Sequence, residues 1–274
     1  MTLHVYEDLE QGSDEWLAAR CGIVTASVVG QLISKGAPDA LTVECPKCQA
    51  LSAEPCISTA RKVPSPIKTI HDERSAAASE LPPVFKVAET DTARALLMTL
   101  AAERITGHVE PIHPSREMQR GTLDEPYARD VYSEQHEPVD VIGFMVRDYA
   151  GFKIGYSPDG LISDAGLIEI KSRNQKIQLK TVLDDAVPAG NMAQIQCGLL
   201  VSGRRWLDYV SYCGGMPLYV NRVRPERAWF DAILEAASCA EETIREMVAT
   251  YTAATEGKPA TERIDHFEEL EITF

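Results

Sequence analysis

The fold of this chain is decided by the stretch Gly155-Tyr-Ser-Pro-Asp-Gly-Leu-Ile-Ser-Asp-Ala-Gly-Leu-Ile-Glu-Ile-Lys171, which sets three ionisable groups on a tight pair of strands. Asp159 stands between a proline and a glycine, so we expect it at a bend where one strand has just ended. Residues 167–171 alternate apolar and polar side chains, as a strand does. This alternation places Glu169 and Lys171 on the same face.

Two carboxylates in this arrangement can share one hard divalent cation, because Mg²⁺ prefers a few carboxylate oxygens and keeps several waters. Lys171 would then reach a water or a phosphate beside the ion. Aspartate, glutamate and lysine are also common on exposed strands, so a hairpin with a solvated face is the alternative. The chain has Pro-Asp followed, after nine residues, by Glu-x-Lys. A solvated hairpin does not require so specific a pattern.

Six segments in order resemble the PD-(D/E)XK nuclease superfamily, and more closely the lambda-type phage exonucleases of the YqaJ viral recombinase group. These segments are Trp16-Leu-Ala-Ala-Arg20, Val24-Thr-Ala-Ser27, Gly121-Thr-Leu-Asp-Glu125, Gly155-Tyr-Ser-Pro-Asp-Gly160, Ile168-Glu-Ile-Lys171 and Met192-Ala-Gln-Ile-Gln196. The resemblance implies an α/β fold, with a mixed central sheet flanked by helices and a small zinc-binding insertion. It also implies a Mg²⁺-dependent 5′→3′ exonuclease on linear double-stranded DNA, with Mn²⁺ as the alternative ion.

The resemblance assigns roles to named residues. Two ions per site are expected, held by Glu125, Asp159, Glu169 and the carbonyl of Ile170 (Mg²⁺), with Lys171 as a catalytic group. In this superfamily a glutamine from the next helix reaches the catalytic centre. Gln196 matches it best and Gln194 second.

A second group of residues is expected to bind the 5′-phosphate of the DNA end. Thr25 and Ser27 stand at the start of a predicted helix, where amides, hydroxyls and the guanidinium of Arg20 suit an anion. Ordinary helix capping with a surface arginine is the alternative. The matching residues of lambda-type exonucleases hold that phosphate, which favours the binding role.

Residues 37–89 interrupt the pattern and are predicted to form an inserted zinc module, with the nuclease core in residues 1–36 and 90–274. Two thiols spaced Cys-x2-Cys, a third cysteine and a histidine give a tetrahedral zinc set, Cys45, Cys48, Cys56 and His71. A linker with incidental thiols is the alternative. The segment resembles zinc modules of phage DNA-processing proteins, although Gln49 and Ala53 stand where that pattern has glycine.

Basic residues of this insertion are expected to contact DNA phosphates: Arg61, Lys62, Lys68 and Arg74. The net charge of −14 opposes bulk binding to nucleic acid, so a local basic groove would be needed. Seven cysteines, an odd number and mostly scattered, suit a reducing compartment. No apolar run reaches 18 residues, so we expect a protein of the cytoplasm, the host's if phage-encoded, with no membrane contact.

The chain in order predicts helices over residues 13–20, 27–34, 91–105, 115–134, 175–184, 191–202 and 226–254. Gly121 and Pro126 should kink or divide the fourth of these, whose inward residues are predicted to be Met118, Leu123, Tyr127 and Val131. A meander of three strands over 139–146, 152–156 and 166–171, with two more strands at 205–213 and 218–224, would give five strands.

Two other functions compete with the exonuclease. A RecB-like structure-specific endonuclease shares the catalytic residues but has no use for Arg20, Thr25 and Ser27. A non-catalytic zinc-containing DNA-binding protein would not need Asp159, Glu169 and Lys171 intact. The resemblance further implies a single-strand annealing partner and a homotrimer that encircles DNA, although the sequence carries no interface signature.

Overall fold

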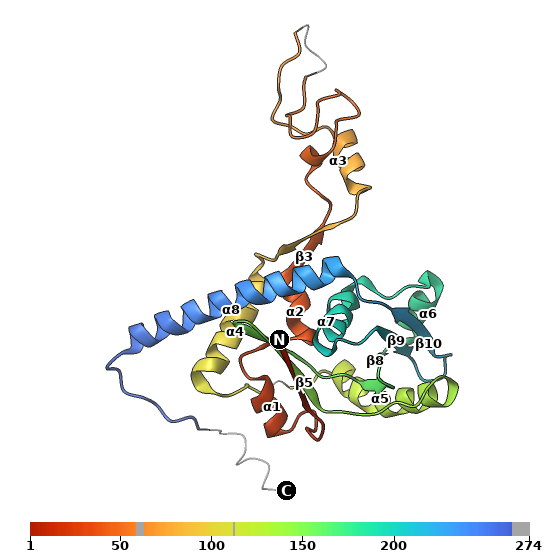
Figure 1. Cartoon of the computed structure of the whole chain (residues 1–274), viewed down its shortest axis with the longest axis vertical. Helices are drawn as coiled ribbons and strands as arrows, with labels where there is room; N and C mark the ends of the chain where they lie inside the picture. The colour runs from red at the N-terminus through yellow and green to blue at the C-terminus, as the bar shows by residue number, and fades with distance from the viewer. Residues whose placement is uncertain (59–62, 112, 265–274) are drawn as a thin grey trace.

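The computed structural model describes residues 1–58, 63–111 and 113–264 of the 274-residue chain. Within them, helices flank two four-stranded sheets, and a two-stranded ladder rises away from this body (Figure 1). The first sheet has the order β1-β5-β6-β2, and β2 runs parallel to β6 while the other pairs are antiparallel. Its strands are β1 Thr2–Tyr6, β2 Val24–Thr25, β5 Phe144–Tyr149 and β6 Phe152–Tyr156.

The second sheet has the order β10-β9-β8-β7, in which β8 and β9 are parallel and the other pairs antiparallel. Its strands are β7 Gly160–Ile162, β8 Gly166–Ser172, β9 Trp206–Tyr212 and β10 Tyr219–Val223. A parallel pair needs a long crossover, and here the chain between β8 and β9 supplies two helices. These are α6 Gln175–Asp184 and α7 Met192–Ser202, with a 3-10 turn at Ala189–Asn191 between them.

The other helices of the body lie between β1 and β5 in the chain or follow β10. They are α1 Asp14–Arg20, α2 Ala26–Val29 with a 3-10 turn at Gly30–Leu32, α4 Asp91–Thr106, α5 Arg116–Gln135 and α8 Arg227–Thr255. Helix α8 buries one face against the body, at positions spaced three and four apart, as a 3.6-residue period requires. Its C-terminal part extends beyond the body (Figure 1). Within the described residues, no helix is both long enough and apolar enough to cross a membrane.

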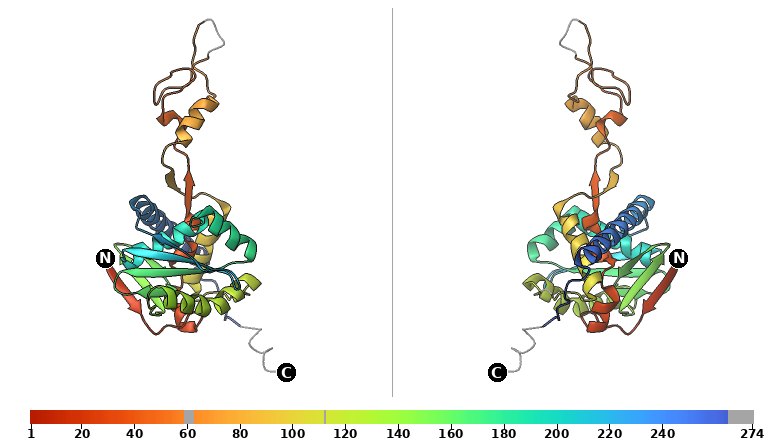
Figure 2. Two further views of the ribbon diagram at one scale, coloured as in Figure 1. Left: turned by 90° about the vertical axis from the view of Figure 1, so that its right-hand side faces the viewer. Right: turned by 90° about the vertical axis from the view of Figure 1, so that its left-hand side faces the viewer.

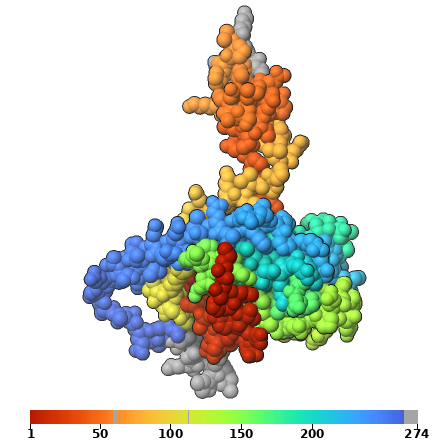
Figure 3. All heavy atoms as spheres, viewed as in Figure 1, coloured from red at the N-terminus to blue at the C-terminus, as the bar shows by residue number. Residues whose placement is uncertain are grey.

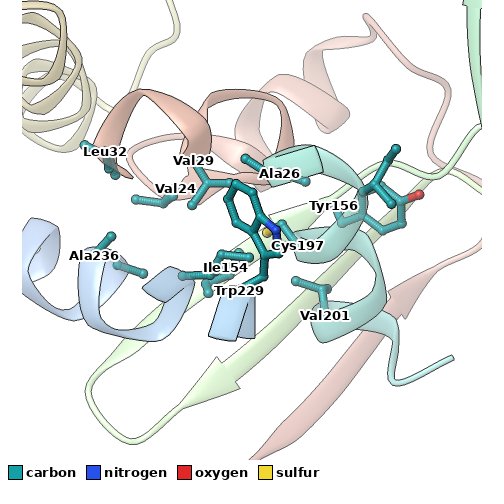
Figure 4. Close-up of a cluster of buried hydrophobic side chains, with 14 of the residues drawn as sticks. Val24, Ala26, Val29, Leu32, Ile154, Tyr156, Cys197, Val201, Trp229 and Ala236 are labelled. Carbon is teal, nitrogen blue, oxygen red and sulfur yellow. The ribbon is translucent and has the colours of Figure 1, made fainter. Parts of the chain in front are cut away.

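The main core forms where α2, β6, α7 and α8 meet, and Figure 4 shows their buried side chains converging. Trp229 of α8 lies among Val29, Ile154 and Cys197 in this cluster. Helix α7 approaches β6 closely because it has glycine at position 198. A Cβ there would lie 2.6 Å from the ring of Tyr156, nearer than real Cβ contacts come. The glycine therefore sets the distance at which α7 presents its side chains to the sheet.

The ladder consists of β3 Ile33–Gly36 and β4 Val84–Val87, which pair antiparallel from Ile33 opposite Val87 to Gly36 opposite Val84. Beyond it, residues 37–58 and 63–83 project from the body as a separate lobe (Figures 1 and 3). The lobe includes a 3-10 turn at Ala40–Thr42 and the helix α3 Asp72–Ser79. At the ladder's base the ring of Phe85 lies 4.5 Å from that of Trp229, which ties β4 to α8.

The fold class is confirmed: helices flank mixed sheets in an α/β arrangement (Figure 2). The strand count is different, because β6 and β8 belong to two sheets rather than to one meander of a five-stranded sheet. The predicted helix over 27–34 ends at Val29, because residues 33–36 pair with β4 instead. The acidic stretch 265–274 lies outside the described residues.

Helix α5 also departs from its prediction. It is one helix from Arg116 to Gln135 that includes Pro126, so neither Gly121 nor Pro126 divides it. Its buried residues are Ala128 and Tyr132, whereas Leu123 is 70% and Tyr127 65% exposed. Of the predicted inward residues, Met118 is exposed as well. Three of the four residues expected to face the core therefore face solvent, while Val131 is half-buried, and the inward face carries Ala128 and Tyr132.

Candidate active site and metal centres

Asp159 lies at the junction of the two sheets. Strand β6 leads into it from the first sheet, and β7 begins one residue later in the second. The β7–β8 pairing sets Gly160 opposite Ile168, so the bend lies beside the middle of β8. The N–H of Ile170 donates to Asp159 Oδ2 at 2.6 Å. Burial raises the pKa of Asp159, against the opposing effects of Lys171, this N–H and Arg129.

Glu169 is fully buried, and its two oxygens have different surroundings. Oε1 accepts from Lys171 Nζ at 2.5 Å and from Gln194 Nε2 at 2.6 Å. Oε2 is buried and has no partner among the described residues. Burial raises the pKa of Glu169 to about 7, although Lys171 opposes the rise. Burial alone would lower the pKa of Lys171, but the carboxylates of Glu169 and Asp159 outweigh it, so that pKa is raised.

The third carboxylate, Glu125, comes from α5. Burial and then the charge of Asp159 raise the pKa of Glu125 to about 7. Arg129, one turn later, donates from Nη2 to Glu125 Oε1 and from Nε to the Asp159 carbonyl at 3.0 Å. The sequence reasoning missed Arg129. Its spacing of four residues from Glu125 was the available signal, since such positions are neighbours on a helix.

This site fits a divalent cation on its donor chemistry. Three carboxylates stand against two cationic side chains, and one buried carboxylate oxygen lacks any partner among the described residues. Burial, which raises the pKa of Glu125 and Glu169, disfavours the charged forms of both carboxyl groups. A cation would offset the cost of burying their charge. Ile170 is held beside Asp159 through its N–H, and its carbonyl stays a predicted ligand.

The two glutamines of α7 take different roles, which corrects the preference for Gln196. Gln194 donates to Glu169, whereas Gln196 is fully buried away from the carboxylates. The Gln196 amide donates to the Arg224 carbonyl and accepts from the Glu226 N–H, both at 2.9 Å. Residues two positions apart in a helix are separated by about 200° around its axis, so only one of the two glutamines can face Glu169.

We expect Gln194→Ala to lower hydrolysis and Gln196→Ala to lower stability. Gln194 fixes a carboxylate of the site, and outer-shell partners of metal ligands typically contribute about 10–100-fold to activity or metal affinity. Gln196 connects α7 to the segment before α8, so its loss removes two hydrogen bonds, at roughly 0.5–1.5 kcal/mol each. Turnover and thermal melting of both variants check this. Equal loss of turnover at unchanged melting temperature in the two would contradict it.

The three residues predicted to bind a 5′-phosphate lie on the β2–β6 side of the site. Strand β2 pairs Thr25 with Gly155, so the Thr25–Ser27 segment lies beside the end of β6 that leads to Asp159. The hydroxyls of Thr25 and Ser27 are 3.1 Å apart. The guanidinium of Arg20 lies 4.4 Å from the centroid of the Trp16 ring, and the Trp16 Nε1 donates to Ser157 Oγ at 2.9 Å. Burial lowers the pKa of Arg20, against the opposing charge of Glu103.

The cysteine cluster of the lobe meets the geometry of a zinc site. The ligand atoms all lie within 4.8 Å of one another, in a group formed by Cys45, Cys48, Cys56 and His71. Structural zinc takes sulfur and nitrogen donors in a tetrahedron. Gln49 and Ala53 adopt φ of 58° and 67°, the left-handed conformation that glycine favours, so both turns form without glycine. The Ile57 N–H bonds to Cys48 Sγ and lowers the pKa of that thiol to about 6.

One predicted DNA contact of the lobe is wrong. Arg74 is fully buried, and its guanidinium donates to the carbonyls of Val43, Leu51 and Glu54 at 2.7–2.9 Å. An arginine that binds three backbone carbonyls inside a lobe cannot reach a phosphate outside it. Lys68 is exposed, while Arg61 and Lys62 lie outside the described residues.

Comparison with known proteins gives two family matches. Residues 68–205 match the YqaJ-like viral recombinase domain, and residues 13–93 match a putative DNA-binding phage zinc finger domain. No curated protein matches the chain. The solved structures include an alkaline exonuclease, LHK-Exo, from Laribacter hongkongensis, with TM-score 0.63 and 24% identity over 89% of this chain and 98% of that one. LHK-Exo in complex with dAMP gives TM-score 0.62, again at 24% identity and with the same coverage.

Proposed function

Because the chain belongs to the YqaJ-like viral recombinase family, a family of nucleases, we propose that it is a Mg²⁺-dependent 5′→3′ exonuclease that degrades linear double-stranded DNA. The observation that carries the proposal is the convergence of Glu125, Asp159, Glu169 and Lys171 from α5, the β6–β7 bend and β8. The likeness of fold to LHK-Exo supports it. That neighbour was solved with dAMP, a mononucleotide of the kind that an exonuclease releases.

In this proposal the carboxylates of Glu125, Asp159 and Glu169 and the carbonyl of Ile170 would hold two Mg²⁺ ions, with Mn²⁺ as the alternative. When bound, such ions stabilise the attacking and leaving oxygens of phosphodiester hydrolysis. Lys171 keeps its charge, since its pKa is raised, and would orient the attacking water or stabilise developing negative charge. Gln194 holds Oε1 of Glu169, which leaves Oε2 directed elsewhere for an ion.

The direction of digestion would come from a 5′-phosphate site formed by Arg20, Thr25 and Ser27. An exonuclease that anchors the 5′-phosphate beside its hydrolytic centre cuts from that end. The β2–β6 pairing supports this placement, because it brings Thr25 to the same end of β6 as the Asp159 bend. Stacking on Trp16 holds the Arg20 side chain while leaving its N–H groups for a phosphate.

We further propose that residues 37–89 are a structural zinc module inserted in a core of residues 1–36 and 90–274, and that the module helps to hold duplex DNA. The match to a phage zinc finger domain and the cysteine cluster support the zinc. A single-strand annealing protein as partner and a homotrimer remain proposals from the resemblance, as does action in the cytoplasm of a host cell.

To test the proposal, the purified protein is incubated with three duplexes: linear with 5′-phosphate, linear with 5′-hydroxyl, and covalently closed. Each is incubated with Mg²⁺ and with a chelator, and mononucleotide release is followed. The proposal expects Mg²⁺-dependent release from linear duplexes, fastest with 5′-phosphate. Cleavage of the closed duplex would favour a structure-specific endonuclease. Binding without any hydrolysis would favour a non-catalytic zinc-containing DNA-binding protein.

Arg20→Ala is expected to reduce the preference for 5′-phosphate over 5′-hydroxyl ends by roughly tenfold or more. Hydrogen bonds to charged groups contribute about 1.5–3 kcal/mol, and every 1.4 kcal/mol is tenfold. Arg94→Ala is the matched control, because Arg94 is exposed on α4 and pairs only with Asp91 and a neighbouring carbonyl among the described residues. If the unmodified protein degrades both ends at one rate, Arg20, Thr25 and Ser27 have no role in phosphate binding.

A further inference from the structure

Arg173 extends the row of side chains that contains Glu169 and Lys171. It directly follows β8, and its N–H donates to the Tyr212 carbonyl at 2.7 Å, which continues the pairing with β9 by one residue. Alternate residues of a strand point to one face. The backbone therefore directs the side chain of Arg173 to the face where Glu169 meets Lys171.

Two neutral side chains fix the guanidinium of Arg173. Its Nη2 donates to Asn191 Oδ1 at 2.8 Å and to the Tyr209 hydroxyl at 3.0 Å. Tyr209 lies opposite Glu169 in the register of β8 and β9, and Asn191 directly precedes α7. The guanidinium is thus held between the Glu169 row and the beginning of the helix that carries Gln194.

The charge of Arg173 has no acidic partner at ion-pair distance in the part of the chain that the structure describes. Its Nε is buried and lacks a hydrogen-bond partner among the same residues. Arg104 and Arg129, which are also half-buried, each pair with a glutamate instead. A buried N–H without an acceptor is costly unless a ligand supplies one.

We propose that Arg173 binds the DNA backbone phosphate on the 3′ side of the one being hydrolysed, in the same strand. The inference rests on the proposed function and names a substrate contact for it. A guanidinium has five N–H donors, and neutral partners take two of them here, so the others remain for phosphate oxygens. A cation at this place would also reduce the repulsion between a polyanion and a chain with a net charge of −14. Asn191 and Tyr209 orient the guanidinium of Arg173 without neutralising its charge.

The test measures binding separately from hydrolysis. Affinity for a 5′-phosphorylated duplex is followed by fluorescence anisotropy over a salt series, with Ca²⁺ in place of Mg²⁺. Arg173→Gln is expected to weaken binding about tenfold and to reduce the slope of log affinity against log salt by about 0.7–0.9, the value for one phosphate contact. Arg173→Lys should retain most of that slope, because it keeps the charge. Lys153→Gln, the same charge change at the far end of β6, should leave both quantities unchanged.

Steady-state hydrolysis in Mg²⁺ completes the test. Arg173→Gln is expected to raise KM about tenfold with a smaller change in kcat. The proposal would be overturned if Arg173→Gln kept the normal slope of log affinity against log salt while both Arg173 variants melted at a lower temperature. Arg173 would then only stabilise the position of α7. If the unmodified protein binds DNA but releases no nucleotide, the proposed function fails, and the slope in Ca²⁺ still decides the role of Arg173.

Discussion

Glu169→Gln is expected to reduce Mg²⁺-dependent hydrolysis by roughly a thousandfold or more while the protein stays folded. A metal ion contributes several kcal/mol of charge stabilisation in the transition state, and each 1.36 kcal/mol is tenfold in rate. Removing the carboxylate removes that contribution at Oε2. The fold should tolerate the change, because the amide has the same shape and burial already disfavours the charged form of Glu169. Turnover and thermal melting without metal are the measurements.

Asp164→Asn is the control for this variant. Asp164 is exposed at the turn between β7 and β8, so its loss changes the net charge equally without touching the site. It should keep full turnover. Asp159→Asn should behave like Glu169→Gln, since both carboxylates belong to one cluster. If a variant that combines Asp159→Asn and Glu169→Gln kept turnover within tenfold of normal, the assignment of the site would be contradicted.

Cys48→Ser is expected to release about one zinc per chain and to unfold the lobe while sparing the body. Zinc contributes on the order of 10 kcal/mol to small modules, more than the small core of the lobe can replace. That core consists of Cys45, Ala50 and Cys56 with a few half-buried neighbours. Elemental analysis measures the metal, and limited proteolysis should show new cleavage between residues 40 and 85.

Cys239→Ser serves as the control, because Cys239 lies half-buried on α8, far from the lobe in sequence and outside the ligand cluster. It should retain zinc and resist protease. The melting of the body, followed by tryptophan fluorescence, should be nearly unchanged in Cys48→Ser, since all three tryptophans lie outside residues 37–83. A zinc-free natural protein whose lobe resists protease would show that these cysteines bind no structural metal.

The parts of the fold that could be predicted from sequence are those set by local rules. Helices α4, α6, α7 and α8 begin and end within about two residues of their predicted limits, because caps and apolar periodicity lie within each segment. The Asp159 bend and the strand with Glu169 follow from proline, glycine and period-two alternation. The fold class followed from the resemblance.

What could not be predicted depends on distant pairing or on function. Residues 33–36 are a strand only because β4 pairs with them, some fifty positions later. The inward face of α5 carries Glu125 and Arg129 while Leu123 and Tyr127 face solvent, so the assumption that apolar residues lie inside selects the wrong side. The choice between Gln194 and Gln196 required the rotation of α7 about its axis, which neighbouring glutamines do not reveal.

The ladder of β3 and β4 makes the lobe interchangeable as a unit. The chain leaves the ladder at Gly36 and returns to it at Val84, which are paired residues, so the path through the lobe begins and ends at nearly one point. A tight turn that joined these two residues would close the same hairpin, with no rearrangement of α2 or α4. Recombination between genomes could therefore exchange, lengthen or delete this DNA-handling attachment while the hydrolytic body keeps its shape.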